Sequence, residues 1–337
     1  MSTATVLLGI DFGGTKIAVA LADLSGRMLA TTTVESAAEL GARAAFDRVA
    51  QAAWRLMADQ NDPQLAAVGV STFGIPFEDR VELAPAIDGW DSFPLGRELR
   101  AAFPGALVRM ATDAKAAARA EATWGALAGC DPAIYLNLGT GLSVAIVAGG
   151  QVIAGHHAAS GEIGYNLRHV SDVGVPLESR VPLEWVVSAK GLAKQATAAA
   201  GGTRELTSAQ AFEASVGDPA LEGVIDEFIA ELAFHLVNLA ISIDPVRIAV
   251  GGGMTGSWER LRPGLEQALR AGVPFPPDLV LAEFNYDAPL IGAVALAVEA
   301  AHPRRDPATA GAPLYPDGML NLMRPEPTLN NASIKKD

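Results

Sequence analysis

An acid, two glycines, a threonine and a lysine stand together near the start of the chain. They are Asp11, Gly13, Gly14, Thr15 and Lys16, and the apolar runs on both sides predict a β-hairpin with a tight polar turn. Glycines let backbone N–H groups approach an anion closely, while the hydroxyl and the ammonium group add a donor and a positive charge. The acid could organise a hydrated Mg²⁺. This set suits the phosphates of a nucleotide, although an ordinary hairpin turn has a similar composition.

Glycine turns follow two further apolar runs, far along the chain. They fit neither the dinucleotide fingerprint nor the P-loop, because the glycines of those motifs lie at fixed spacing between one strand and one helix. The recurrence of such turns after three strands predicts further phosphate-binding loops of the same kind. The later turns are Gly139, Thr140 and Gly141 after residues 133–138, and Gly251, Gly252 and Gly253 after residues 246–250.

One further acid lies at the junction between an expected strand and an expected helix. Asp113 follows the apolar residues 106–111 and precedes the alanine-rich residues 114–128. Phosphoryl transfer to an alcohol needs a group that accepts the hydroxyl proton, and a side chain at such a junction points into a cleft. Asp113 is the candidate for this role. The alternative is a helix N-cap, for which aspartate is also favoured.

Hydrophobic periodicity predicts helices and strands in alternation along most of the chain. A length of 337 residues indicates about two domains. The pattern therefore favours an α/β class with a smaller lobe that ends near residue 112 and a larger lobe that begins at residue 113. The helices are expected over residues 37–60, 94–103, 191–200, 218–243 and 291–301, and a buried strand over residues 65–71.

The composition excludes several classes of protein. The net charge of −13 argues against a nucleic-acid binder, which would carry a basic stripe. A single cysteine, Cys130, cannot form an internal disulfide and fits a reducing compartment. We find no leader pattern and no apolar stretch of membrane length, so we expect a cytoplasmic protein that does not bind a membrane.

The chain resembles the ROK family of bacterial sugar kinases, because six of its motifs match the family pattern in the same order. The similarity extends over about residues 5–302. The resemblance implies the two-lobed actin-like ATPase (ribonuclease H-like) fold with a central cleft between the lobes. It assigns residues 1–112 and a returning helix at about 288–302 to the small lobe, and residues 113–287 to the large lobe. Beyond the resemblance, the proline-rich, polar and charged composition predicts a loose C-terminal extension over residues 303–337. The motifs lie at residues 11–16, 112–118, 138–150, 161–164, 244–253 and 288–293.

The resemblance also implies an activity, namely that of an ATP- and Mg²⁺-dependent, glucokinase-like kinase that acts as a homodimer. Asp113 matches the catalytic base of the family, and residues 251–253 would lie near the adenosine. Glu162 and Glu184 match two glutamates that bind sugar hydroxyl groups, although a solvated surface glutamate is the alternative for Glu184. Asp11 would contact the magnesium ion indirectly.

The chain departs from the family pattern at the sugar pocket. Tyr165 stands where the family has a histidine, Thr112 replaces an asparagine, and Ala86 replaces a second asparagine, with Asp88 nearby as a substitute. The cysteines that hold zinc in the family are missing from residues 168–182, so no structural zinc site of the usual type is expected. These departures favour an acceptor other than glucose, such as an amino sugar or a cyclitol, over degraded catalysis.

Two other functions are compatible with the resemblance. One is a catalytically silent sugar-binding protein, which would bind sugar without turnover. The other is a sugar-responsive transcriptional regulator. Such regulators carry a helix-turn-helix domain ahead of the first phosphate motif, which begins here at Asp11, and the acidic balance does not suit DNA.

Overall fold

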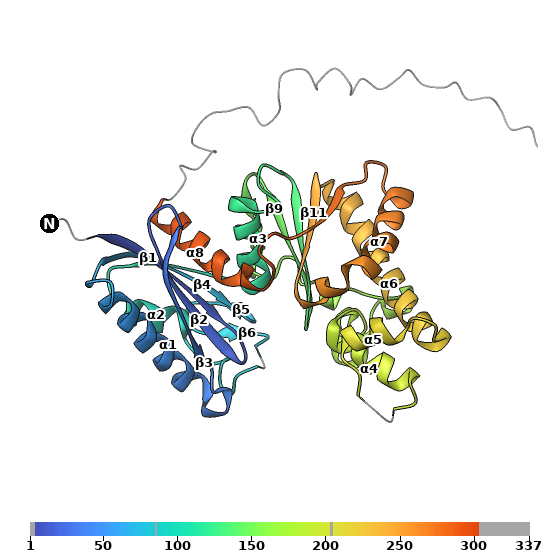
Figure 1. Cartoon of the computed structure of the whole chain (residues 1–337), viewed down its shortest axis with the longest axis horizontal. Coiled ribbons are helices and arrows are strands. Elements are labelled where there is room, and N and C mark those ends of the chain that lie inside the picture. Colours follow the sequence, from blue (N-terminus) through green and yellow to red (C-terminus); the bar gives the residue numbers. More distant parts are fainter. Residues whose placement is uncertain (1–3, 85, 203–204, 303–337) are drawn as a thin grey trace, which may run out of the picture. The chain divides into compact units, whose positions relative to one another are not determined.

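The computed structural model describes residues 4–302 except residues 85, 203 and 204. Residues up to His302 form one compact unit, which contains two five-stranded sheets and eight α-helices among the described residues (Figure 1). The extension expected over residues 303–337 lies outside the described part of the chain. No helix in the described part is long and apolar enough to cross a membrane.

The first sheet contains the predicted hairpin. Strands β1 and β2 pair antiparallel, so the turn of residues 13–15 lies between them as expected. The order across the sheet is β3-β2-β1-β4-β7, and β1, β4 and β7 run parallel. Their carboxyl ends therefore meet at one edge. The strands are β1 (Thr5–Phe12), β2 (Lys16–Ala22), β3 (Met28–Glu35), β4 (Gln64–Thr72) and β7 (Leu107–Thr112).

The second sheet repeats this plan. Its order is β10-β9-β8-β11-β12, with an antiparallel hairpin at β8 and β9 and parallel pairing from β8 through β11 to β12. The same connectivity in two sheets agrees with the prediction of a two-lobed fold, and the boundaries of the lobes stay predictions. The strands are β8 (Ala133–Leu138), β9 (Leu142–Ala148), β10 (Gln151–Val152), β11 (Arg247–Gly251) and β12 (Asp278–Leu281); a separate hairpin joins β5 (Ile75–Pro76) and β6 (Val81–Glu82).

The predicted helices are confirmed, with corrections to their bounds. The helix expected from residue 37 begins at Gly41, after a short 3₁₀-helix. The helix after β7 ends at Trp124 rather than Ala128, because the Glu121 carboxylate accepts the backbone N–H of Ala126 and so ends the helical hydrogen bonding. The last helix begins at Ala288, as the resemblance implied, rather than at residue 291, where the hydrophobic pattern placed its start. Helices α5 and α7 and strand β12 are not among the elements expected from the sequence. The helices are α1 (Gly41–Ala58), α2 (Leu95–Ala102), α3 (Asp113–Trp124), α4 (Ala189–Ala199), α5 (Ser208–Ala214), α6 (Pro219–Ile243), α7 (Trp258–Gly272) and α8 (Ala288–Ala301).

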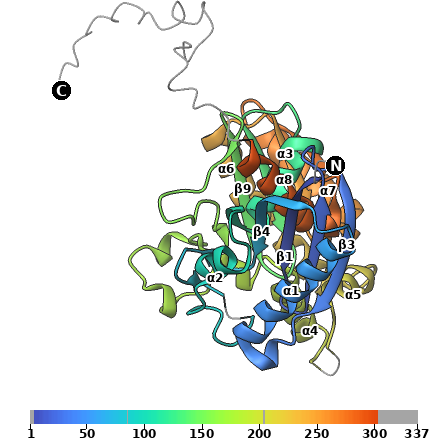
Figure 2. The ribbon, with the colours of Figure 1, turned by 90° about the vertical axis from the view of Figure 1, so that its left-hand side faces the viewer.

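Helices α3 and α8 link the two sheets. Helix α3 begins directly after β7 of the first sheet but packs Ala117 and Ala118 against the second sheet. Helix α8 follows β12 of the second sheet but packs Val294 and Ala297 against Leu7 of the first. The two helices lie side by side in both views (Figures 1 and 2). Residues 114–121 of α3 are therefore buried between the sheets, whereas Thr123 and Trp124 at its end are exposed.

A small residue is required where these helices touch. A Cβ at Gly292 of α8 would overlap the backbone carbonyl of Ala116 in α3. We expect Gly292→Ala to lower the free energy of unfolding by about 1–3 kcal/mol, because the helices must move apart. Urea denaturation measures this loss.

Gly223→Ala provides the matched control. Gly223 lies inside α6, and a Cβ there would meet no atom within 4 Å. This change should stabilise the protein by about 0.4–1 kcal/mol, because alanine favours the helix. A loss of stability in both variants would contradict the role given to the contact between α3 and α8.

Candidate active site

The parallel strands of the first sheet bring polar side chains to one edge. Asp11 of β1 lies opposite Ser71 of β4, and Thr72 lies opposite Thr112 of β7. The Ser71 hydroxyl donates to the Asp11 carboxylate at 2.7 Å. The sequence analysis missed Ser71, which only the strand register places beside Asp11. The carboxyl ends of parallel strands are the usual position of ligand sites in α/β proteins.

The two later glycine turns lie together at the corresponding edge of the second sheet. Asn137 of β8 pairs with Gly251 of β11, and a Cβ at Gly139 would lie 3.7 Å from the backbone nitrogen of Gly253. A Cβ at Gly252 would stand 2.5 Å from the carbonyl oxygen of Leu138. Gly252 therefore has to be glycine for the two turns to approach one another, whereas a Cβ at Gly139 would lie at an ordinary contact distance.

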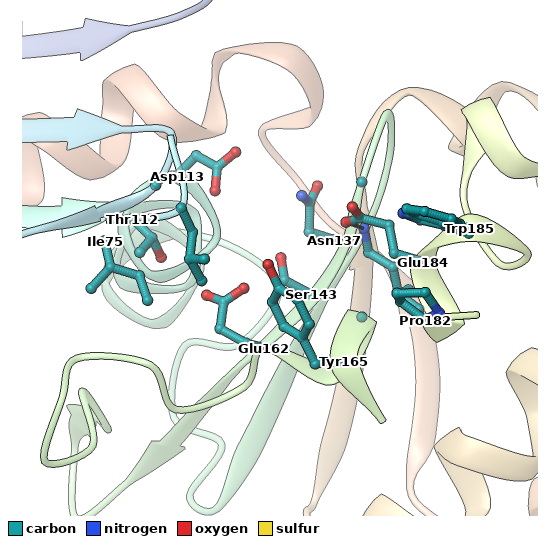
Figure 3. A pocket seen from close by; sticks show the side chains of 15 residues that line it. Ile75, Thr112, Asp113, Asn137, Ser143, Glu162, Tyr165, Pro182, Glu184 and Trp185 are labelled. Atoms are coloured by element: carbon teal, nitrogen blue, oxygen red, sulfur yellow. Dashed lines mark hydrogen bonds between the residues drawn. The ribbon is translucent and has the colours of Figure 1, made fainter. Parts of the chain in front are cut away.

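A cavity of about 220 Å³ lies where the ends of both sheets meet (Figure 3). Six of the predicted site residues line it, and no lysine, arginine or histidine is among its described lining residues. The lining comprises Gly74, Ile75, Leu83, Thr112, Asp113, Asn137, Gly141, Leu142, Ser143, Glu162, Gly164, Tyr165, Pro182, Glu184 and Trp185. Asn137 was missed by the sequence analysis, although its place at the end of β8, two residues before the glycine turn, could have signalled it.

Asp113 is the first residue of α3 and lines this cavity. The helix is capped by the neighbouring residue instead: the Thr112 side chain accepts the backbone N–H of Lys115 at 3.4 Å. Asp113 Oδ1 accepts only the N–H of Ala114, at 2.7 Å, among the hydrogen bonds of the described residues. The N-cap role therefore belongs to Thr112, and the Asp113 carboxylate faces the cavity (Figure 3).

Burial dominates the electrostatics of Asp113. Loss of contact with water raises the pKa of Asp113, the N–H of Ala114 and the Lys115 ammonium lower it, and Glu184 raises it further. Burial also raises the pKa of Glu162, against the opposing effect of Lys115. Carboxylates with raised pKa values in a polar cavity are typical of proton-accepting sites.

Glu184 is held against the second glycine turn. Its carboxylate accepts the backbone N–H of Leu142 at 2.9 Å, and a Cβ at Gly141 would stand 2.5 Å from Oε2. Glu184 belongs to a short 3₁₀-helix, Leu183–Trp185. It is half-buried and lines the cavity, so its position is not that of a solvated surface glutamate.

Tyr165 lies at the rim of the cavity, at the end of the 3₁₀-helix Ile163–Tyr165. Burial, followed by Glu184 and Glu162, raises the pKa of its hydroxyl. The Arg180 guanidinium donates to the carbonyl of Tyr165 at 2.7 Å, and Arg168 pairs with Glu231 of α6. These two arginine contacts stabilise residues 165–182, the segment in which the family pattern has its zinc ligands. Among the described residues no group of three or more His, Cys, Asp or Glu side chains could hold a metal ion.

Asp11 is the residue that could contact a magnesium ion through water. Burial raises its pKa to about 6, Ser71 lowers it and Asp113 raises it further. Mg²⁺ commonly keeps several water ligands and uses only one or two carboxylates in addition to substrate phosphates. Asp11 is a single buried carboxylate near Asp113, and a bound Mg²⁺ would compensate the cost of its charge.

Several predicted site residues lie outside the lining of this cavity. Thr15 and Lys16 are exposed in the first turn, and Thr140 lines a neighbouring cavity that shares Glu184 and Trp185. Asp88 is exposed, and its backbone carbonyl accepts the N–H of Ala42. Its role as an acceptor contact stays a prediction. The others outside the lining are Asp11, Gly13, Gly14, Gly139, Gly251, Gly252 and Gly253.

Comparison with curated proteins finds kinases. The chain is 33% identical over 299 residues to the bifunctional enzyme NanE/NanK of Brucella melitensis. The aligned region covers 86% of this chain and 54% of that protein. The chain thus spans about half the length of this relative. It is 28% identical to the kanosamine kinase of Amycolatopsis mediterranei, over 86% of this chain and 95% of that enzyme.

Solved structures agree on the fold. A ROK hexokinase from Thermus thermophilus matches with a TM-score of 0.75 and 29% identity, over 87% of this chain and 98% of that one. A ROK glucokinase from Streptomyces griseus in complex with glucose and AMPPNP matches with a TM-score of 0.68 and 28% identity, over 86% and 98%. The predicted α/β, actin-like fold is confirmed.

The family model covers almost the whole described part of the chain. It is the model of the ROK family, and it matches residues 7–300. With the repeated sheet plan and the cavity at the start of α3, this match establishes that the chain belongs to the ROK family.

Proposed function

We propose that this protein transfers a phosphoryl group from ATP to a hydroxyl group of a sugar or a sugar-like polyol, with Mg²⁺ as cofactor. The observation that carries the proposal is the position of Asp113. Its carboxylate faces a polar cavity at the start of α3, which Gly141 of the second glycine turn also lines.

Carboxylates and polar groups equip this cavity for the acceptor. Asp113 accepts the proton of the attacking hydroxyl, and its raised pKa brings it closer to the working pH. Glu162 and Glu184 accept hydrogen bonds from other hydroxyl groups, while Asn137 and Ser143 add weaker partners. A charged acceptor makes the site demanding, because a missing hydroxyl leaves it unpaired.

The donor side begins at the second glycine turn. A cavity of about 300 Å³ next to the first one is lined by Thr140, Lys190 and Lys194. The N-terminus of α4 adjoins the turn, where the N–H of Ala189 donates to the Gly139 carbonyl. Backbone N–H groups and ammonium groups are the usual partners of phosphates. When bound beside Asp11, Mg²⁺ would neutralise phosphate charge.

The reaction exchanges one phosphorus–oxygen bond for another. The acceptor oxygen bonds to the terminal phosphorus of ATP as the bond to the β-phosphate oxygen breaks, and ADP leaves. Asp113 holds the hydroxyl proton. The residues of this chain align the two substrates and exclude water, which is the main contribution an enzyme can make to phosphoryl transfer.

The charge of the cavity constrains the acceptor. Asp113, Glu162 and Glu184 line it, and its described lining offers no cation. We therefore expect neutral hexoses, cyclitols and amino sugars to be phosphorylated, and hexuronic acids to be rejected, because like charges repel. The similarity to a kanosamine kinase supports an amino sugar as one acceptor.

A coupled assay of ADP release tests the proposal. The panel contains glucose, mannose, N-acetylmannosamine, kanosamine, a C7-cyclitol and glucuronic acid, each with ATP and Mg²⁺. Turnover of at least one neutral or amino acceptor, with none of glucuronic acid, is expected. Tight binding of a sugar without turnover of any acceptor would instead favour a silent sugar-binding protein.

A further inference from the structure

Lys115 stands in the wall between two cavities. It belongs to the first turn of α3, and its side chain is only 6% exposed. On one side its Nζ lies 3.8 Å from Oε1 of Glu162, which lines the acceptor cavity. On the other side Lys115 lines a cavity of about 160 Å³ together with Arg109, Arg119 and Glu299. Lys115 does not itself line the acceptor cavity.

The charges of the second cavity direct the Lys115 ammonium toward Glu162. Glu299 is the one carboxylate among the described residues that line this cavity, and two arginines share it. Arg119 Nε lies 3.1 Å from one of its oxygens, and an Arg109 nitrogen lies 3.4 Å from the other. A buried ammonium needs a counter-charge, and for Lys115 that charge comes from the acceptor side.

Glu162 depends on Lys115 in return. Within the described chain, Lys115 is the one residue that forms an ion pair with the Glu162 carboxylate. Burial raises the pKa of Glu162 and of Asp113, and the Lys115 ammonium lowers both. The lysine therefore favours the charged form of two carboxylates that face the same cavity.

We propose that Lys115 is a positioning residue for the acceptor. Its ammonium group holds the Glu162 carboxylate in a fixed orientation toward the cavity, where Glu162 accepts hydrogen bonds from acceptor hydroxyl groups. This inference rests on the proposed function and assigns Lys115 an indirect part in it, through Glu162.

Lys115→Met tests the proposal. It should raise the KM for the acceptor by about 10- to 100-fold, the factor that corresponds to one hydrogen bond to a charged group. The KM for ATP should change little, because the glycine turns are untouched. Lys115→Arg should recover most of the acceptor affinity, because it keeps the charge and the 160 Å³ cavity beside it has room for the larger side chain.

Arg119→Met provides the control on the same helix. Arg119 is also a buried cation, one turn further along α3, but it binds Gly150, Gln151 and Glu299 rather than the acceptor cavity. Its loss should lower the melting temperature and leave the acceptor KM unchanged. An acceptor KM that rises equally in both variants would overturn the proposal, as would an unchanged KM in Lys115→Met.

A double variant tests whether Lys115 acts through Glu162. Adding Lys115→Met to Glu162→Gln should raise the acceptor KM little further, whereas independent effects would multiply and contradict the proposal. Should Lys115→Met fail to fold, Lys115→Gln carries the same expectation.

Acceptor binding can also be measured without turnover, from the fluorescence of Trp185, which lines the cavity. A wild-type protein that binds sugar but shows no turnover would refute the proposed function and leave this test of Lys115 intact.

Discussion

Asp113→Asn is expected to lower kcat by about 10²- to 10⁴-fold, the usual cost of removing a general base. The asparagine has the same shape, and its side-chain oxygen can still accept the N–H of Ala114, as Asp113 does at 2.7 Å. Helix α3 should be unaffected, because Thr112 provides its cap. Steady-state assays with the best acceptor measure kcat, and titration of the Trp185 fluorescence should show that the acceptor still binds.

The pH dependence gives a second measure of the same residue. Burial raises the pKa of Asp113 above its ordinary value of 3.8, and only the ionised form accepts a proton. The kcat/KM of the wild-type enzyme should therefore fall at the acid end. The residual activity of the variant should lose the part of this fall that comes from Asp113 and keep the part that comes from Asp11, whose pKa is raised to about 6. Asp131→Asn is the matched control, because that carboxylate binds the N–H groups of Gly149 and Gly150 on the surface. A variant at position 113 with more than about a tenth of the wild-type kcat would exclude a general base there.

Local signals account for the parts of the fold that could be predicted. The hairpin of β1 and β2 and the helix expected over residues 218–243, which is α6, were predicted because apolar periodicity and turn residues are properties of neighbouring residues. Helix α7 was missed, since Pro263 lies inside it and obscures a helical pattern. Strand β12 has only four residues, too few for periodicity to reveal.

The site shows the same division. Asp113, Glu162 and Glu184 were found through motifs, and the structure brings all three to one cavity. Ser71 was missed, because its bond to Asp11 joins strands sixty residues apart. In the sequence, Lys115 is a polar residue in an alanine-rich segment, and nothing there distinguishes it from an exposed helix residue. Only the packing of α3 between the sheets shows that its ammonium is buried beside Glu162.

Asp11→Asn should have opposite effects on stability and on activity. The pKa of Asp11 is raised from 3.8 to about 6 in the fold, so the folded protein keeps a proton that the unfolded chain has lost between these pH values. Stability therefore falls as the pH rises from 3.8 to 6 and stays lower above 6. Removing the charge should raise the free energy of unfolding at pH 7.5 by about 1–3 kcal/mol. Urea denaturation without Mg²⁺ or nucleotide measures the gain.

Activity should change in the other direction, because the same charge serves the magnesium ion. The kcat/KM for ATP should fall by about 10- to 100-fold, as is typical when an indirect metal contact is lost.

The Ser71→Ala variant changes the ionisation of Asp11 without replacing its side chain. It removes the hydroxyl that lowers the pKa of Asp11, so ATP use should weaken near pH 6 and recover at pH 8, where Asp11 is ionised again. Asp11→Asn should recover at no pH. A variant at position 11 that gains no stability at pH 7.5, or keeps wild-type use of ATP, would contradict the role given to this carboxylate. Burying the charged Asp11 lowers the free energy of unfolding, and the same charge stabilises the magnesium ion once nucleotide and metal are bound.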